Sequence, residues 1–343
     1  MLASVSVAVA LPGVDARGTG WTRLPPLVHP RLLHASVAVA VGPAELEAAG
    51  HVMGKAAVRR MGDGAHLGSL PDLEVLDSIE CLVNDGKAWS VLPQLKLPRP
   101  MYGLAVARWN KTAVLAAGGS GETGGSATGT RDVWLIDFAR GTVEPAPPLP
   151  FAIFGVQMTA GGDGDAGGVW LAGGWRNYNL CAQQLLRLNA TAAAWQVFPH
   201  ARYAHCFGGM GVHGKEVGKD TVFVFGGSAD NAPALNTLEQ FAASSSGWTV
   251  LQPLVYARDM MAAAQVGGAL YAIGGRDPEM AFLDSVEVYH LDSGWAVDAA
   301  LTLPVPLAGA SAATSGRLVV VSGGVSAFNA THASGGAFRL DVA

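Results

Sequence analysis

Residues 222–227 read VFVFGG: four strand-forming residues followed directly by two glycines. Alternating Val and Phe fit a strand that is buried on both faces of a sheet. The glycine pair after it allows a turn with positive φ and a close approach to neighbouring backbone. Four other segments have the same form: residues 114–119 (VLAAGG), 169–174 (VWLAGG), 270–275 (LYAIGG) and 318–324 (LVVVSGG). The chain is therefore built from a repeated unit.

The repeat has a period of about 50 residues. The last glycines of the five doublets are at 119, 174, 227, 275 and 324, so the intervals are 55, 53, 48 and 49. Between doublets the chain carries an alternating strand, a turn and often a tryptophan, as in residues 283–301 (LDSVEVYHLDSGWAVDAAL). Other copies of this element contain Trp89, Trp195 and Trp248. Several strands per unit at this period predict a β-propeller rather than a helical solenoid.

The order of these elements resembles the kelch repeat, and the resemblance covers nearly the whole chain. It implies an all-β fold, a β-propeller of four-stranded kelch blades, formed by residues 1–343 as a single domain. We expect six blades, because we count six inner strands that begin near His34, Tyr102, Phe154, His205, Met261 and Ala308.

The two ends of the chain are expected to complete one blade between them. Residues 20–27 (GWTRLPPL) read like the last strand of a repeat, and residues 335–343 (GGAFRLDVA) read like a third strand without a fourth. The N-terminal strand would then complete the C-terminal blade and remove an open sheet edge. Residues 1–12 are interpreted as an additional strand or the remnant of a targeting signal.

Composition and motifs exclude several classes of protein. The net charge is −5 and only 14% of the residues are charged, so no basic field is present to bind nucleic acid. No apolar stretch reaches the 18 residues expected of a membrane span. The nine histidines lack the spacing of a zinc site, and no nucleophile elbow, Walker loop or dinucleotide fingerprint is found. We expect no metal, no cofactor and a binding protein rather than an enzyme.

The cysteines and sequons point to different compartments. Cys81, Cys181 and Cys206 are few, scattered and odd in number, so we expect reduced buried thiols and a cytoplasmic location. The alternative is a secreted protein or one of the secretory pathway, because three N-x-T sequons lie in predicted turns, at Asn110, Asn189 and Asn329.

Candidate binding residues lie in the loops that a propeller gathers around one mouth of its central channel. Aligning the segments before the inner strands places arginine at one position in four of the six repeats, as Arg31, Arg99, Arg202 and Arg258. Two interpretations remain open. The arginines either bind carboxylates of a ligand at the mouth, or they pair with carbonyls and acidic groups between blades.

Further candidates follow the glycine doublets or lie beside the arginines. Trp175, Arg176 and Tyr178 belong to a stretch, residues 175–179 (WRNYN), that directly follows a doublet. Trp, Tyr and Arg are enriched at binding hot spots, although Trp175 could instead pack between blades. The remaining candidates are Tyr102, Tyr203, Arg276 and Asp277.

These features predict a protein-interaction module that binds a segment of another protein at an arginine- and aromatic-lined mouth. An acidic segment would be the natural ligand. A six-bladed kelch ring also resembles the bacterial sialic-acid epimerases, which implies a carbohydrate-active enzyme or sugar-binding protein that takes an acidic sugar. A third alternative is a substrate receptor of a ubiquitin ligase, a role of kelch domains that would here require a separate adaptor.

Overall fold

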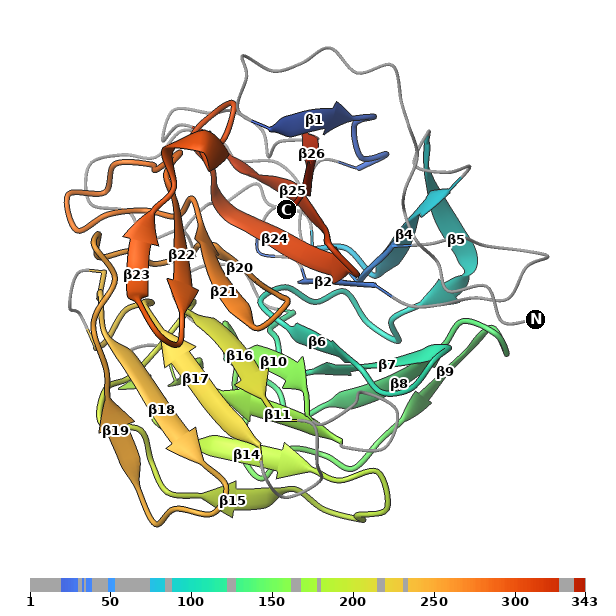
Figure 1. The fold of residues 1–343 in the computed structure, drawn as a ribbon. Coiled ribbons are helices and arrows are strands. Elements are labelled where there is room, and N and C mark those ends of the chain that lie inside the picture. Colours follow the sequence, from blue (N-terminus) through green and yellow to red (C-terminus); the bar gives the residue numbers. More distant parts are fainter. Residues whose placement is uncertain are drawn as a thin grey trace.

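The fold is an all-β propeller of antiparallel four-stranded sheets (Figure 1). It is seen in a computed structural model that describes residues 20–29, 33, 35–38, 49–52, 75–83, 88–121, 128–161, 168–177, 180–214, 220–230, 234–326 and 336–342. Among these residues, no helix is long and apolar enough to cross a membrane.

Six sheets have four strands each, and five of them use four strands in chain order. These five contain β2 (Ala35–Ala38), β3 (Ala49–Val52), β4 (Ser78–Val83) and β5 (Ala88–Lys96); β6 (Ala105–Arg108), β7 (Ala113–Ala117), β8 (Val133–Asp137) and β9 (Thr142–Pro145); β10 (Gln157–Ala160), β11 (Val169–Ala172), β14 (Leu185–Leu188) and β15 (Gln196–Phe198); β16 (Gly209–His213), β17 (Thr221–Phe225), β18 (Leu238–Ala242) and β19 (Trp248–Val250); and β20 (Ala262–Val266), β21 (Ala269–Ile273), β22 (Val286–His290) and β23 (Gly294–Val297). A separate two-stranded sheet pairs β12 (Trp175–Asn177) with β13 (Leu180–Cys181).

The remaining four-stranded sheet joins the two ends of the chain. It contains β24 (Ala308–Ser315), β25 (Leu318–Val325), β26 (Ala337–Asp341) and, on the outside, β1 (Trp21–Leu24). Trp21 pairs with Leu340 and Leu24 with Ala337 in an antiparallel register. The pairing agrees with the expectation that an N-terminal strand completes the last sheet.

The inner strands of the sheets surround a common axis. Each contacts the inner strand of the next sheet, in the cyclic order β2, β6, β10, β16, β20, β24 and back to β2 (Figure 1). These strands begin close to the positions expected from the sequence. The space between them is therefore the axial channel of the propeller.

The glycine doublets lie where two stretches of backbone approach closely, one from the next sheet and one from the same sheet. Gly226 and Gly227 have φ of 58° and 83°, which L-residues rarely adopt. A Cβ at Gly226 would lie 2.9 Å from the carbonyl oxygen of Arg258, and one at Gly227 would lie 2.7 Å from that of Cys206. The apolar run before the doublet is buried. Glycine is needed here for both conformation and space.

Tryptophans hydrogen-bond the backbone that leads in from the preceding sheet. The indole N–H groups of four of them donate to carbonyl oxygens over 2.7 to 3.0 Å, namely Trp21 to Leu301, Trp89 to Pro25, Trp195 to Pro147 and Trp248 to Pro199. A hydrogen bond of this kind contributes about 1 kcal/mol. In these four sheets the tryptophan therefore fastens the outer strand to the connection that precedes the sheet, whereas the indole N–H of Trp295 on β23 has no partner among the described residues.

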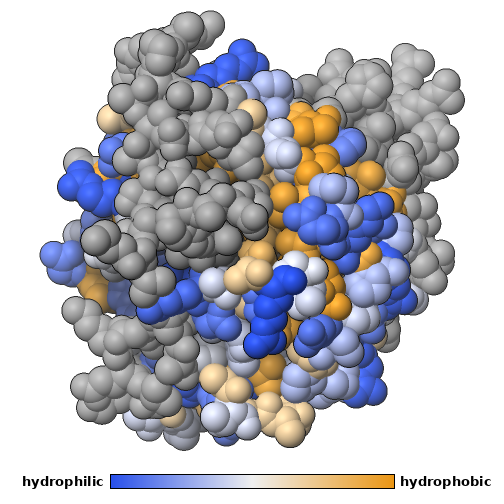
Figure 2. All heavy atoms as spheres, turned by 90° about the vertical axis from the view of Figure 1, so that its right-hand side faces the viewer, coloured by the Kyte–Doolittle hydropathy of each residue, from blue (hydrophilic) through white to orange (hydrophobic). Residues whose placement is uncertain are grey.

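The outer surface mixes hydrophobic and hydrophilic residues. On the side shown in Figure 2, a band of hydrophobic residues runs between hydrophilic ones. Half of the residues in the chain are hydrophobic, and part of this excess is exposed, for example at Val197, Val250 and Val297 on outer strands.

Candidate partner-binding face

Six backbone hydrogen bonds form a closed ring around the propeller axis. Each sheet contributes one residue at or just before the start of its inner strand, and its N–H donates to the carbonyl oxygen of the next residue in the ring over 2.6 to 3.1 Å. All six residues have φ between 51° and 68°. Passing from each donor to its acceptor, the ring residues are Leu33, Gly309, Met260, Phe207, Gly155 and Gly103. The ring places the six loops in a common register.

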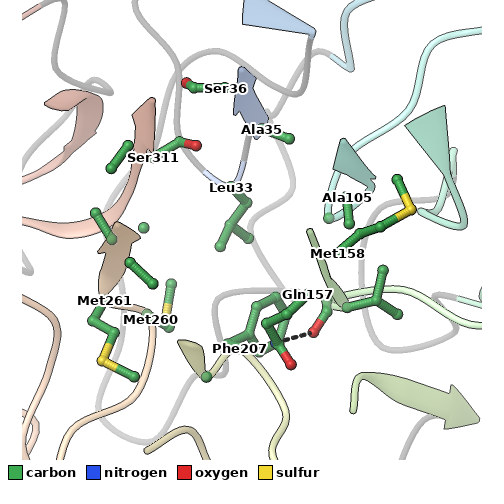
Figure 3. A pocket seen from close by; sticks show the side chains of 18 of the residues that line it. Leu33, Ala35, Ser36, Ala105, Gln157, Met158, Phe207, Met260, Met261 and Ser311 are labelled. Carbon is green, nitrogen blue, oxygen red and sulfur yellow. Dashed lines mark hydrogen bonds between the residues drawn. The ribbon is translucent and has the colours of Figure 1, made fainter. Parts of the chain in front are cut away.

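Three of the ring residues carry large side chains, which lie over two of the three ring glycines. A Cβ at Gly155 would lie 2.7 Å from the ring of Phe207. A Cβ at Gly309 would lie 3.3 Å from Cε of Met260 and 3.5 Å from Cδ2 of Leu33. These three side chains project into the space around the axis (Figure 3). They narrow the channel at this end.

Below the ring, the channel holds a cavity of about 160 Å³ lined mainly by small and apolar residues. The polar side chains in its lining are Ser36, Gln157 and Ser311, and none of the described residues that line it is charged. Nε2 of Gln157 donates to the carbonyl oxygen of Gly155 over 3.1 Å. Oε1 of Gln157 is buried and accepts no hydrogen bond from the described residues. The cavity thus offers neutral groups only.

Counting back from the ring residues gives a different alignment of the arginines from the one expected from the sequence. Two residues before each ring residue, every described side chain is buried: Met101, Ile153, His205, Arg258 and Leu307. Four residues before each ring residue, the side chain is exposed or half-buried, and we call this set the rim residues: His29, Arg99, Phe151, Tyr203, Tyr256 and Val305. Arg258 therefore has an inner position, Arg99 is a rim residue and Arg202 precedes a rim residue. The prediction that the arginines share one structural position is therefore wrong.

Buried glutamates hold three of the rim loops. Glu80, Glu239 and Glu287 are fully buried on the third strands of their sheets. Each carboxylate accepts two consecutive backbone N–H groups, at N···O distances of 2.6 to 3.1 Å, from Val28 and His29, Arg202 and Tyr203, or Val255 and Tyr256. Hydrogen bonds to a charged acceptor are stronger than neutral ones. The loop backbone is thereby turned inward, and the exposed side chains of Tyr203 and Tyr256 face solvent.

Arg258 is a structural residue rather than part of an open mouth. Its side chain is fully buried, and Nη2 lies 2.7 Å from Oε1 of Glu287. Nη1 donates to the carbonyl oxygens of Gly274 and Ser285 over 2.7 and 3.0 Å. The guanidinium group thus links the glycine doublet to the third strand through hydrogen bonds from both of its terminal nitrogens. Of the two interpretations of the arginines, pairing with carbonyls and acidic groups holds for Arg258.

Two other arginines lie on accessible surface but already have acidic partners. Arg99 is half-exposed and forms an ion pair with Asp132. Arg276 forms a bidentate pair with the buried Asp259, at 2.9 and 2.6 Å. Burial raises the pKa of Asp259, although Arg276 opposes this effect. Asp277 is half-buried and its Oδ1 accepts the N–H of Ala281. Arg202, which is exposed, has no acidic partner among the described residues, so this face keeps an unpaired positive charge there.

Four aromatic rings form a cluster around Phe154, at the end of the channel that carries the ring. Tyr102, Trp175 and Phe207 make edge contacts with Phe154, with centroids 5.6 to 6.4 Å apart. Tyr102 is buried, contrary to its assignment as a binding residue. Trp175 is half-buried against Phe207. We call these four residues the aromatic cluster.

The stretch after the third-sheet doublet is a strand rather than an exposed loop. Trp175 and Arg176 belong to β12, which pairs with β13. The guanidinium of Arg176 lies 4.5 Å from the ring centroid of Phe151, a cation–π contact with a rim residue. Two predicted binding residues, Arg31 and Tyr178, lie outside the described residues.

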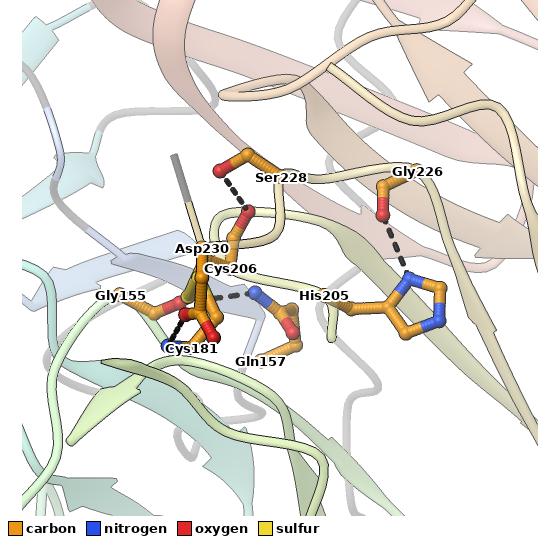
Figure 4. The surroundings of a disulfide bond; sticks show 8 residues. All are labelled: Gly155, Gln157, Cys181, His205, Cys206, Gly226, Ser228 and Asp230. Atoms are coloured by element: carbon orange, nitrogen blue, oxygen red, sulfur yellow. Dashed lines mark hydrogen bonds between the residues drawn. A yellow bond between two sulfur atoms is a disulfide. The ribbon is translucent and has the colours of Figure 1, made fainter. Parts of the chain in front are cut away.

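A disulfide joins Cys181 to Cys206, so the expectation of three reduced thiols is wrong. Cys81 is the free and buried cysteine. The bond links β13 to the loop before β16, next to ring residue Phe207 (Figure 4). The backbone N–H of Cys181 also donates to Asp230, and Cys206 forms a β-bridge with Ser228. The disulfide thus fixes the strand that carries Trp175 to the next sheet.

Comparison with known proteins agrees with this architecture. Residues 257–294 match the kelch motif, and they include Arg258, the doublet Gly274–Gly275 and Glu287. The chain is a β-propeller that contains a kelch motif.

The propeller has the overall fold of a solved protein described as "Structure of YjhT". The TM-score is 0.68 at 12% sequence identity, over 91% of this chain and 95% of the other. No curated protein matches the sequence of the kelch chain.

Proposed function

We propose that this kelch propeller binds another protein through its mouth face, made of the rim residues and the aromatic cluster. We also take the six four-stranded sheets to be the six blades of one closed ring. The main supporting observation is the position four residues before each ring residue, where the exposed or half-buried side chains include a histidine, an arginine, a phenylalanine and two tyrosines. Aromatic residues and arginine are the types that dominate binding energy at protein interfaces.

The charge of this face argues for a partner segment with hydrophobic anchors rather than an acidic one. Arg258 is buried, and Arg99 and Arg276 have acidic partners within the chain, which leaves Arg202 as the exposed arginine without one among the described residues. Tyr203, Tyr256 and Val305 each expose about two fifths or more of their surface. An aromatic or aliphatic side chain of a partner would bury these surfaces without breaking an ion pair.

A triple variant, Phe151→Ala/Tyr203→Ala/Tyr256→Ala, tests the proposal. The backbone N–H groups of residues 203 and 256 remain available to the buried glutamates, so we expect the melting temperature to change little. Leu291→Ala is the matched control, because Leu291 is 61% exposed at the turn between β22 and β23, on the opposite face.

The measurement is quantitative mass spectrometry of proteins retained by the immobilised full chain from an extract of its own cells. The retained partner is then titrated as a purified protein. We expect the affinity to fall at least tenfold for the triple variant and to remain unchanged for Leu291→Ala. Equal loss in both variants, or no loss in either, would contradict binding at the mouth face.

A small neutral ligand in the channel is the second candidate. It is favoured by Gln157, whose buried Oε1 has no hydrogen-bond donor among the described residues that surround it. A polyol or neutral sugar could supply that donor, whereas an acidic sugar would find no charged partner in this cavity. Melting of the protein with neutral and acidic monosaccharides distinguishes the two, because a ligand of the folded state raises the melting temperature.

A further inference from the structure

We propose that Asn110 is an N-glycosylation site, placed on the face opposite the mouth, of a protein that matures in an oxidising secretory compartment. The inference is independent of partner binding. It follows from the geometry of one turn, the access to that turn and the disulfide.

The sequon Asn110-Lys111-Thr112 forms the turn between β6 and β7. Oδ1 of Asn110 accepts the backbone N–H groups of Thr112 and Ala113, both over 2.9 Å. Oγ1 of Thr112 lies 3.5 Å from the same oxygen. Nδ2 of Asn110 donates to none of the described residues. The side chain is thus held by its oxygen, and the nitrogen that would bear the glycan is free.

The turn is open to a large modifying enzyme. Lys111 is exposed, and Asn110 borders an open surface hollow with Thr112, Asp137, Ala139 and Arg140. Strand β6 runs from the side of ring residue Gly103 to Asn110. The turn therefore lies at the far end of the strand from the mouth, and a glycan there would leave the rim residues uncovered.

The reaction is a transfer from a lipid-pyrophosphate-linked oligosaccharide. The bond between the first sugar carbon and the pyrophosphate oxygen breaks, and a bond from that carbon to Nδ2 of Asn110 forms. Nδ2 loses one proton, and the lipid pyrophosphate leaves. The chain supplies the nucleophilic amide and the neighbouring Thr112 hydroxyl, and the cell supplies the donor and the transferase.

The disulfide provides independent support for the compartment. Cys181 and Cys206 are bonded, and such bonds persist in secretory and extracellular proteins and are rare in reducing compartments. The sequons and the disulfide therefore agree, whereas the expected cytoplasmic location depended on three reduced thiols.

A second sequon gives an internal comparison. Asn189 lies in the turn between β14 and β15, where Oδ1 is buried without a hydrogen-bond partner among the described residues. A Cβ at Gly168 would lie 2.8 Å from Cα of Asn189, so the local backbone is crowded. We therefore expect higher occupancy at Asn110 than at Asn189. Asn329 lies outside the described residues.

Peptide mapping of the full protein purified from its own cells tests the proposal. Treatment with peptide:N-glycosidase in heavy-oxygen water should convert Asn110 to a labelled aspartate, and mapping without reductant should recover Cys181 and Cys206 in one linked peptide. Thr112→Ala should remove one glycan from the intact mass, whereas Thr191→Ala should leave the glycan on Asn110.

Two outcomes would overturn the proposal. An unmodified Asn110 throughout the purified protein rejects the glycosylation site, even if the disulfide is present. Free Cys181 and Cys206 thiols in protein alkylated at lysis reject the oxidising compartment. Melting of enzymatically deglycosylated wild type beside Thr112→Ala checks that the variant is folded, and equal melting temperatures are expected.

Discussion

His205 occupies in one sheet the position that Arg258 occupies in the next sheet along the chain. Each lies two residues before its ring residue and is buried. Nδ1 of His205 lies 2.7 Å from the carbonyl oxygen of Gly226, and Nε2 lies 3.1 Å from Oε2 of Glu239. Arg258 bridges the first glycine of its own doublet and its own third-strand glutamate in the same way. Different side chains thus link the doublet to a buried carboxylate.

Arg258→Met should lower the free energy of unfolding by about 3–5 kcal/mol, because it leaves the carboxylate of Glu287 buried and without its cation. Urea unfolding followed by tryptophan fluorescence measures the change. Arg202→Met is the control, since Arg202 is exposed, and a loss within about 0.5 kcal/mol is expected there. Similar losses for both variants would show that burial of Arg258 is not the cause.

Reduction of the Cys181–Cys206 bond should destabilise the propeller by about 3 kcal/mol, from the loop-closure entropy of a disulfide of this separation. The two cysteines are 25 residues apart. The double variant Cys181→Ser/Cys206→Ser should melt at a lower temperature than wild type and should no longer respond to reductant. Cys81→Ser, which leaves the bond intact, should still respond. A wild-type melting curve unaffected by reductant would contradict the prediction.

Gly155→Ala should lower the free energy of unfolding more than Gly316→Ala does, although both glycines have positive φ, of 63° and 58°. Both variants carry a backbone cost of about 1–2 kcal/mol. A Cβ at Gly155 would lie 2.7 Å from the Phe207 ring, whereas one at Gly316 would meet nothing within 4 Å. Because of this clash, Gly155→Ala should lose about 1–3 kcal/mol more of the free energy of unfolding than Gly316→Ala, as is found for overpacked cores. Equal unfolding midpoints in urea would argue against close packing at the ring.

Cys81 should react with thiol reagents only after unfolding. Burial, and to a lesser degree Glu80, raises the pKa of its thiol to about 12. The thiol is therefore protonated at pH 8, and only the thiolate is nucleophilic. Ellman's reagent should detect no thiol in the native protein and one after denaturation without reductant. Rapid labelling of the native protein at pH 8 would contradict the burial of Cys81.

The same shift predicts a change in stability at alkaline pH. A raised thiol pKa stabilises the folded state fully below the unfolded value, near 8.5. The contribution is lost as the pH rises from that value towards about 12. Wild type should therefore lose more stability between pH 8 and pH 10 than Cys81→Ser does, measured by urea unfolding at the two pH values.

Much of the fold could be predicted because its signals are local. Each of the five doublets has two glycines with positive φ in the structure, and a short apolar run before each one forms a buried strand. The segment at Trp21 could be assigned to the last sheet because each end of the chain lacked the strand that the other supplied. Such features depend on nearby residues and on a count of strands.

The binding face was less predictable because its register is set in three dimensions. The ring position is glycine in three sheets but Leu33, Phe207 and Met260 in the others, so no common residue marks it. The arginines were consequently aligned one or two positions away from equivalent sites. One usable signal was missed: an acidic residue in the third strand, as at Glu80, Glu239 and Glu287, whose burial indicates a structural partner.

The disulfide could not be inferred from spacing. Cys181 lies on β13 and Cys206 in the loop before β16, and they meet because β13 reaches towards that loop. With three cysteines in the chain, three pairings were available, and nothing in the sequence preferred one of them.

The pairing of β1 with β26 has a consequence for biosynthesis. Trp21 is among the first described residues to leave the ribosome, yet its backbone partner, Leu340, is among the last. Strand β1 must therefore wait, unpaired, until translation has reached β26, more than 300 residues later. During that interval the buried side chains of β1 are available to chaperones, and this sheet is completed only when β26 captures β1.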